Sequence, residues 1–287
     1  MTAADDSLTA PARVSEELAA LGPYFGVEFH GGVGGGAAEP QTGPGPGSAA
    51  ALELVGGDQA GLAGGGASEV SVSSVSAAAP WRPMRELVDH PDALAERVAG
   101  VRAFLAAGTG QEAAGVELRV AASVVHLGLV ARVVSPLLAL AVLHQRCGRV
   151  RAADLWWQPT LGSLFPLSLR EAALDSGATF SDGVLGGVIG EFGMAIAGFG
   201  VSERIVRGNV ASALVGAGKI LSAARPEVSA LIQDLLSSPY LAGSGAFEPD
   251  GTFRRRSCCL IYRAAPDRDG ALCGDCVLGA ARGAMDT

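Results

Sequence analysis

Four cysteines near the C-terminal end are the residues of this chain with the clearest capacity for chemistry. Cys258 and Cys259 are adjacent, and Cys273 and Cys276 complete the pattern C-C-x13-C-x2-C. Clustered thiols in a cytosolic protein act as metal ligands more often than they form disulfides. The residues alone leave three uses open: an iron–sulfur cluster, a zinc ion, or a redox-active dithiol.

The spacing helps to rank these three uses. Structural zinc usually binds two C-x2-C knuckles, whereas the first pair here is adjacent, with Cα atoms about 3.8 Å apart. The side chains of that pair converge on one cluster edge only if the backbone turns there. The segment 273–276 matches the C-x-x-C of a redox dithiol but lacks the βαβ pattern that accompanies such a motif. The spacing therefore favours an iron–sulfur site first, zinc second and a dithiol last.

Two stretches around these cysteines carry a family resemblance. Arg-Arg-Ser-Cys-Cys-Leu-Ile-Tyr-Arg at 255–263 and Cys-Gly-Asp-Cys-Val-Leu at 273–278 resemble the C-terminus of FhuF-type ferric siderophore reductases. A weaker resemblance extends to 131–136 and 208–214. The resemblance implies that the four cysteines hold a [2Fe–2S] cluster. The family usually has a shorter stretch between the cysteine pairs, so we expect an enlarged loop at 265–270.

The resemblance also implies a function. FhuF-type proteins reduce an Fe(III)–siderophore by one-electron transfer, which releases Fe(II) from the hard oxygen ligands of the chelate. No flavin or nicotinamide fingerprint is present in the sequence, so we expect a separate electron donor such as a ferredoxin or a flavoprotein reductase. Two alternatives belong to other classes: a non-enzymatic iron–sulfur electron carrier or redox sensor, and a zinc-stabilised interaction module.

Several arginines are further candidate site residues. Cationic neighbours stabilise a reduced cluster, so arginines beside the cysteines are expected to raise its potential and to dock an acidic donor or an anionic ferric complex. The alternative is a solvated basic run. The candidates are Arg254, Arg255, Arg256 and Arg263. Arg132 lies in an apolar stretch, and a buried arginine needs a partner, so we expect an ion pair or part of a substrate pocket.

Composition limits the class of protein. The 287 residues are 49% hydrophobic and carry a net charge of −8, which argues against a general nucleic-acid binder. The stretch 120–143 is long enough to span a bilayer. It contains His126, Arg132 and Pro136, however, and a central arginine costs about 2.5–3.5 kcal/mol on insertion. We therefore expect buried core rather than a transmembrane segment. No signal peptide is recognisable, which favours the cytoplasm.

The expected architecture is α+β, predominantly helical, with short strands and a C-terminal iron–sulfur-binding segment. Four parts are predicted. Residues 1–30 form an N-terminal segment with one strand at 24–30, and 31–80 form a glycine-rich flexible insertion. Residues 81–245 form a mainly helical reductase-like domain, and 246–287 form a [2Fe–2S] cluster-binding module.

Apolar periodicity predicts individual elements of the folded part. A proline inside a helix removes a main-chain donor, so the longest helix is expected to kink or divide at Pro136. The glycine-rich stretch 176–200 does not fit a single assignment. The predicted helices cover 91–107, 116–145, 202–224 and 227–236, and the predicted short strands lie within 150–157 and 163–169.

Overall fold

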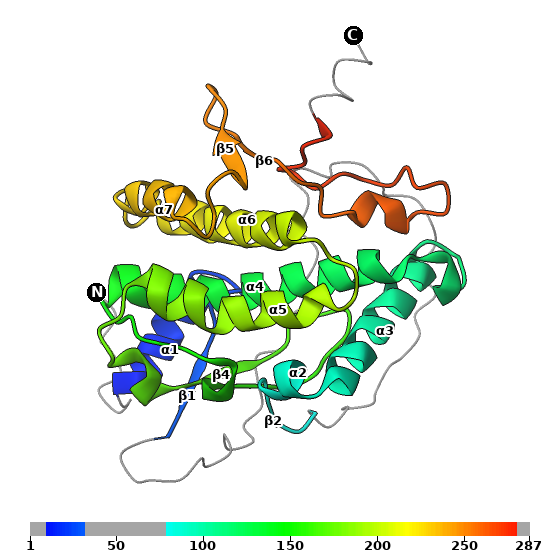
Figure 1. The fold of residues 1–287 in the computed structure, drawn as a ribbon. Helices are drawn as coiled ribbons and strands as arrows, with labels where there is room; N and C mark the ends of the chain where they lie inside the picture. The colour runs from blue at the N-terminus through cyan, green and yellow to red at the C-terminus, as the bar shows by residue number, and fades with distance from the viewer. Residues whose placement is uncertain (1–9, 32–78, 280–287) are drawn as a thin grey trace, which may run out of the picture.

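The computed structural model describes residues 10–31 and 79–279 (Figure 1). The chain has the predicted α+β architecture and is mostly helical. Its α-helices are α1 Ala10–Ala20, α2 Glu86–Asp89, α3 Pro91–Gly108, α4 Leu118–Leu143, α5 Gly190–Ala197, α6 Glu203–Leu221 and α7 Val228–Ser237. The predicted glycine-rich insertion at 31–80 falls almost wholly outside the described residues.

The strands within the described residues are short and form two sheets. The strands are β1 Glu28–His30, β2 Arg82–Pro83, β3 Leu155–Trp157, β4 Leu167–Arg170, β5 Gly245–Phe247 and β6 Phe253–Arg255. The first sheet has the order β1-β4-β3-β2, with β1 parallel to β4 and the other neighbours antiparallel. In the second sheet β5 and β6 are antiparallel, and Gly245 lies opposite Arg255. The N-terminal strand therefore pairs with a strand from the predicted helical domain.

Short non-α turns connect these elements. They are the 3-10 helices η1 Ala113–Gly115, η2 Ala152–Asp154, η3 Glu171–Leu174 and η5 Ile261–Ala264, together with the π-helix η4 Ser181–Ile189. The π-helix and α5 occupy the stretch that periodicity could not assign. Gly187 within it has a non-helical backbone, with φ −94 and ψ −118. The mixed helix type is the physical reason why a 3.6-residue period did not fit.

The elements are arranged in layers (Figure 1). The four-stranded sheet, with α1 and α2, lies on one side of α4 and α5. Helices α6 and α7 lie on the other side, and the second sheet and the η5 segment lie beyond α6. Val210, Leu214 and Leu221 of α6 are fully buried in the main core. Helix α6 therefore separates the apolar core from the segment that carries the four cysteines.

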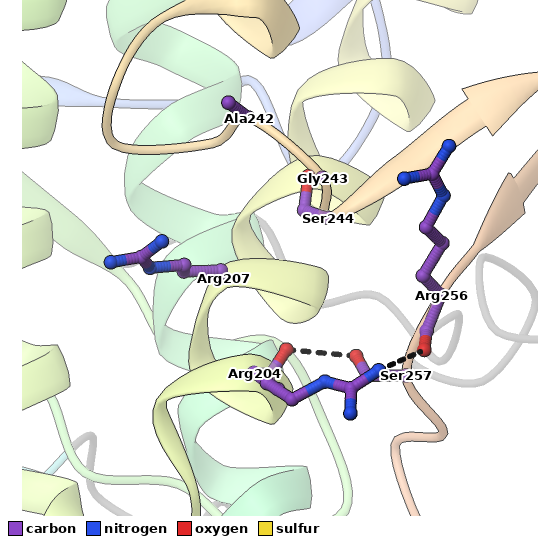
Figure 2. A pocket seen from close by; sticks show the side chains of 7 residues that line it. All are labelled: Arg204, Arg207, Ala242, Gly243, Ser244, Arg256 and Ser257. Atoms are coloured by element: carbon purple, nitrogen blue, oxygen red, sulfur yellow. Dashed lines mark hydrogen bonds between the residues drawn. The ribbon is translucent and has the colours of Figure 1, made fainter.

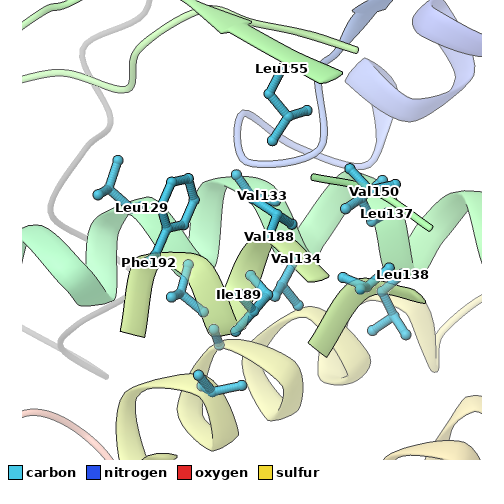
Figure 3. Packing of buried hydrophobic residues seen from close by; sticks show 14 of the residues in the cluster. Leu129, Val133, Val134, Leu137, Leu138, Val150, Leu155, Val188, Ile189 and Phe192 are labelled. Carbon is cyan, nitrogen blue, oxygen red and sulfur yellow. The ribbon is translucent and has the colours of Figure 1, made fainter. Parts of the chain in front are cut away.

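Helix α4 is the central element of the core. Figure 3 shows Val133 and Val134 of this helix close to Val188 and Ile189, which belong to the π-helix. By length and composition α4 could cross a membrane, but 72% of its most apolar window is buried inside the protein. The apolar character of α4 thus serves core packing, with each fully buried large side chain contributing about 1.5–3 kcal/mol.

Pro136 does not divide α4, which continues from Leu118 to Leu143 as one helix. Of the two expected outcomes, a kink or a division, the division was therefore wrong. Pro136 lacks the N–H that would bond the carbonyl four residues earlier, and the neighbouring Ser135 hydroxyl donates to the Ala131 carbonyl at 2.8 Å. Pro136 itself is buried. Packing on both sides of the proline keeps the two halves of the helix in register.

Candidate metal centre

The structure brings the four cysteines of the sequence pattern into one small apolar cluster, called here the cysteine site. The Sγ atoms of Cys259 and Cys273 lie 3.6 Å apart. Three of the four side chains are buried, and Cys258 is only half-buried. All are free thiols, and the apolar residues packed around them are Ile261, Leu272 and Leu278. The fifth cysteine, Cys147, packs against the main core instead.

A sharp backbone turn follows the adjacent cysteine pair. Leu260 has φ 71, in the left-handed region that residues other than glycine seldom adopt. Its N–H donates to the Cys258 sulfur at 3.2 Å, and the N–H of Leu278 donates to the Cys276 sulfur at 3.4 Å. This is the bend that convergence of two neighbouring cysteines requires. Main-chain donors at sulfur favour the thiolate form that binds metal, whereas the hydrogen bond to Cys259 and burial raise the pKa of the Cys258 thiol overall.

The long stretch between the cysteine pairs is folded back on itself. The N–H of Gly270 donates to the Tyr262 carbonyl at 2.9 Å, and the N–H of Arg268 donates to the Ala265 carbonyl at the same distance. Residues 266–269 between these bonds are exposed. The additional residues therefore form a closed surface loop, which leaves the two cysteine pairs together.

Arg255 lies beside the cysteine site and is buried, with 1% of its surface exposed. Its Nη2 donates to the Asn209 side-chain oxygen at 2.7 Å, and its main-chain N–H donates to the Asp275 carbonyl at 3.0 Å. Hydrogen bonds from the Cys258 and Cys273 thiols lower the pKa of Cys259, and the charge of Arg255 acts in the same direction. Arg255 is therefore placed to compensate negative charge on sulfur.

Two further donors of Arg255 remain unused by the protein. Within the part of the chain that the structure describes, its Nε and Nη1 atoms are buried and have no hydrogen-bond partner. A buried donor without a partner costs about 1–3 kcal/mol, and more when it is charged. An acceptor that the polypeptide does not supply would remove this cost, and the sulfur atoms of an iron–sulfur cluster are such acceptors.

A buried polar chain connects Arg255 to α4. Because Arg255 can only donate, the Asn209 oxygen faces it, and the Asn209 amide group donates to the Ser123 carbonyl at 3.1 Å. The same amide lies 3.3 Å from His126 Nδ1, which accepts from it. Burial lowers the pKa of His126 to about 3, with Arg255 adding to the effect. His126 is therefore neutral at physiological pH, and the network carries a single positive charge.

Helix α6 provides a close docking face for this segment. A Cβ at Gly208 would clash with the Ser257 hydroxyl and would lie 3.1 Å from Arg255 Nη2. One turn later, the Ser212 hydroxyl hydrogen-bonds to the carboxylate of Asp275. The lack of a side chain at Gly208 thus allows the strand before the cysteines to approach the helix. The weaker family resemblance at 208–214 covers this contact face.

The residues present fit an iron–sulfur cluster. Four sulfurs are gathered behind an apolar wall, and a buried arginine offers two unpaired donors. No three His, Cys, Asp or Glu side chains among the described residues converge on a position for a single metal ion. A two-iron cluster needs only two cysteines at each iron, whereas a zinc ion needs its four ligands around one point. The donor set and the unpaired arginine donors therefore fit an iron–sulfur cluster.

Arg132 has a structural role rather than the expected ion pair or substrate contact. It is 4% exposed and donates to three main-chain carbonyls, those of Phe165 at 2.9 Å, Tyr24 at 3.1 Å and Gly26 at 2.5 Å. Burial lowers the pKa of Arg132 to about 10, so it stays charged. The expectation of an acidic partner was wrong because carbonyl dipoles satisfy this guanidinium.

The predicted docking arginines occupy different environments. Arg255 is buried, so it cannot form part of a docking surface, and that expectation needs correction. Arg263 forms an ion pair with Glu117 at the start of α4. The Arg254 side chain donates to the Cys276 carbonyl at 3.4 Å. Arg256 alone of these four is exposed.

Sequence reasoning missed the polar side chains that α6 contributes to the site. Asn209 was not singled out, although a polar amide in the middle of an amphipathic helix is a recognisable signal. His126 was noted as a polar residue within an apolar stretch, and the structure places it in the buried network, next to the Asn209 amide group. Arg204, whose main-chain carbonyl accepts from Ser257 at 2.8 Å, was also missed.

Comparison with known proteins identifies the segment that carries the cysteines. The protein family described as FhuF 2Fe-2S C-terminal domain matches residues 255–278. No curated protein matches the chain. The matched residues include all four cysteines and Arg255, and they coincide with the cysteine site. The chain therefore carries a FhuF-type C-terminal domain, with a [2Fe–2S] cluster as its cofactor and a function connected with siderophore iron.

Proposed function

We propose that this protein reduces an Fe(III)–siderophore by one-electron transfer, with Cys258, Cys259, Cys273 and Cys276 as the ligands of its [2Fe–2S] cluster. The observation that supports the proposal is the cysteine site itself, formed within the matched segment. The cluster supplies a one-electron step, for which zinc has no chemistry. Fe(III) gains that electron, and the softer Fe(II) is held weakly by hard oxygen ligands.

The residues around the cysteine site have separate tasks in this proposal. Cys258 is the half-buried ligand, so electrons enter and leave at its edge of the site. Arg255 balances the negative charge of the thiolates and stabilises the reduced form. The apolar side chains around the sulfurs limit water access, which keeps the electrostatic effect of Arg255 strong.

The proposal includes the surroundings of the reaction. The segment 246–287 acts as a cluster-binding module on the outer face of α6, and the mainly helical domain 81–245 supports it. Reducing equivalents come from a separate donor, a ferredoxin or a flavoprotein reductase. The reaction takes place in the cytoplasm, where thiols stay reduced.

Anaerobic single-turnover kinetics test the proposal. The purified protein is reduced with one electron per cluster and mixed with a ferric trihydroxamate, while a chromogenic chelator traps Fe(II). We expect the visible spectrum to return to that of the oxidised cluster, with release of about one Fe(II) per cluster, because one electron reduces one Fe(III) to Fe(II). Cys147→Ser serves as the control, since that thiol packs against the main core and not in the cysteine site.

Two outcomes would support the alternatives. A cluster that exchanges electrons with donor proteins but leaves ferric chelates unreduced would indicate an electron carrier or sensor. A colourless protein containing only zinc would contradict both the reductase and the carrier, and would leave the interaction module.

A further inference from the structure

A small pocket lies on the outer side of α6, next to the cysteine site (Figure 2). Its volume is about 70 Å³. Helix α6 contributes Arg204 and Arg207, the turn at 242–244 forms another wall, and Arg256 and Ser257 follow β6. Ser257 directly precedes Cys258, so the wall of the pocket continues into the half-buried cysteine.

Polar groups of this pocket lack partners in the protein. Ser244 is 6% exposed, and its hydroxyl has no hydrogen-bond partner in the described parts of the chain. The same is true of the buried Arg207 Nε. Within residues 10–31 and 79–279, the Arg256 guanidinium has no hydrogen bond or ion pair, and Arg204 makes one long bond of 3.5 Å to the Arg256 carbonyl. The arginine donors lack acceptors, and the Ser244 hydroxyl can donate to an acceptor as well.

The charge around the pocket is positive. Three guanidinium groups line it, and none of the seven lining residues is acidic. Glu203 pairs with Arg207 through Nη2, which leaves Nε of that arginine available. Figure 2 shows that the three arginine side chains extend in different directions around the turn at 242–244. The unpaired donors and the positive charge of the wall favour an occupant with oxygen acceptors and negative charge, which a carboxylate or a similar oxyanion provides.

We propose that this pocket binds a carboxylate carried by the ferric chelate and so holds the chelate against the Cys258 edge of the cysteine site. This inference rests on the proposed function and names a property of its substrate. Pockets that enclose a drug-sized ligand measure about 300–1,000 Å³, so the pocket has room for one small group and not for a whole chelate. The iron centre then stays outside, next to the half-exposed sulfur.

Equilibrium binding to redox-inert chelates tests the pocket without any electron transfer. The probes are the Ga(III) complex of a linear trihydroxamate that ends in a carboxylate and the Ga(III) complex of its methyl ester, titrated into the cluster-loaded protein. We expect the acid to bind about tenfold more tightly, which corresponds to about 1.4 kcal/mol from charge-assisted hydrogen bonds. Arg256→Gln with Arg204→Gln should reduce this advantage to less than about twofold.

Two further variants sharpen the result. Ser244→Ala should weaken acid binding and leave ester binding unchanged. Arg225→Gln removes an equal charge at the turn after α6, where its side chain is half-exposed, and should retain the preference for the acid. Equal binding of acid and ester to the wild-type protein would overturn the proposal, and so would a preference that survives in the double variant.

The proposal that the pocket binds a carboxylate and the proposal that the protein is a reductase can be refuted independently. If the Fe(III) complexes of acid and ester are reduced at the same rate and with the same KM, the pocket proposal fails and the reductase stands. If the acid binds preferentially but neither Fe(III) complex is reduced, the reductase fails and the pocket stands. A double variant that slows reduction by an acidic donor protein while chelate binding is unchanged would assign the pocket to the donor and refute the proposal.

Discussion

Two buried arginines in this protein have opposite surroundings. Arg132 lies in the core, and three main-chain carbonyls accept its hydrogen bonds. Arg255 lies at the cysteine site, where Asn209 accepts one bond and two donor atoms stay without a partner in the described structure. The fold thus completes the environment of Arg132 by itself. It leaves two donors of Arg255 without acceptors, as expected of a residue that hydrogen-bonds to a bound group.

The difference shows what burial of a charge indicates. A buried arginine must be paired, but the partner need not be a carboxylate, and it need not belong to the polypeptide. The satisfied arginine joins the N-terminal segment to the core, whereas the unsatisfied one lies beside the cysteine site.

Loss of the cluster should have the largest effect, and it should affect only one of the two regions. Cys259→Ser is expected to abolish or strongly alter the [2Fe–2S] spectrum, because a buried ligand is removed. Amide hydrogen exchange should then speed up in 253–279, where Arg255 loses its acceptors, and stay unchanged in β1 and β4. Cys147→Ser is the matched control with a normal spectrum. A normal cluster signal in the Cys259→Ser protein would contradict the ligand assignment.

Replacement of Arg132 should reduce stability most among the arginine variants. Arg132→Met leaves three main-chain carbonyls without a donor, at about 1–3 kcal/mol each, so the free energy of unfolding should fall by roughly 3–9 kcal/mol. Urea unfolding followed by circular dichroism measures this change. The midpoint potential of the cluster, measured on the folded fraction, should stay as in the wild type. A large shift of that potential would break the distinction between the two arginines.

Replacement of Arg255 should have the reverse profile, with a modest loss of stability and a lower midpoint potential. The reduced cluster carries one more negative charge than the oxidised one, and without Arg255 it has no cationic donor to stabilise that charge. Hydrogen bonds to charged groups are worth about 1.5–3 kcal/mol, so Arg255→Gln should lower the potential by roughly 60–130 mV. Potentiometric titration measures the shift. Arg255→Lys retains the charge without the planar set of donors, and should show a smaller decrease.

His126 offers a test of the network behind Arg255 through its pH dependence. The pKa of His126 is about 3 in the folded protein and 6.5 when unperturbed. The unfolded chain therefore binds a proton that the folded protein excludes, and stability falls as the pH drops from about 6.5 to 3. Between pH 7 and pH 5 this group alone should cost about 2 kcal/mol.

The measurement compares unfolding at both pH values for the wild-type histidine and for His126→Asn. Asparagine keeps an acceptor near the position of Nδ1 but does not titrate. Both proteins carry Cys259→Ser, so acid loss of the cluster does not contribute. An equal pH dependence in the two proteins would show that His126 is protonated without a penalty, and that the network is open to water.

Much of the cysteine site could be predicted from the sequence, because its signal is local. Four cysteines in nineteen residues define the donor set, and the family match covers the same residues. The fold class and the principal helices followed from apolar periodicity. Helix α6 was predicted at 202–224 and extends from Glu203 to Leu221.

The remaining features depend on contacts between distant segments. Whether Arg255 or Arg256 is buried depends on which side of β6 faces α6. Residues 254–256 are all arginine, so no alternation of apolar and polar residues indicates the buried side. The π-helix at 181–189 has no sequence period of its own. Its backbone is fixed by bonds such as the 2.9 Å contact from the Val188 N–H to the Val150 carbonyl.

The smallest expected effect is that of replacing Arg263. This variant tests whether the cluster potential depends on Arg255 itself or only on the net charge of the segment. Arg263 pairs with Glu117 at the start of α4, and both side chains are about one-fifth exposed, at 21% and 23%. Hydrogen bonds from Arg119 and Arg263 lower the pKa of Glu117. A partly exposed ion pair is worth at most about 1 kcal/mol, so Arg263→Gln should reduce the unfolding free energy by about 0.5–1 kcal/mol, less at high salt.

The midpoint potential of the Arg263→Gln protein should stay within about a quarter of the shift caused by Arg255→Gln, because Glu117 already balances the lost charge and solvent screens the rest. Both variants remove one positive charge from the same segment. Equal shifts in potential would mean that the cluster senses only the net charge of the segment. The unpaired donors of Arg255 would then have no special role, and the contrast with Arg132 would reduce to a difference in stability.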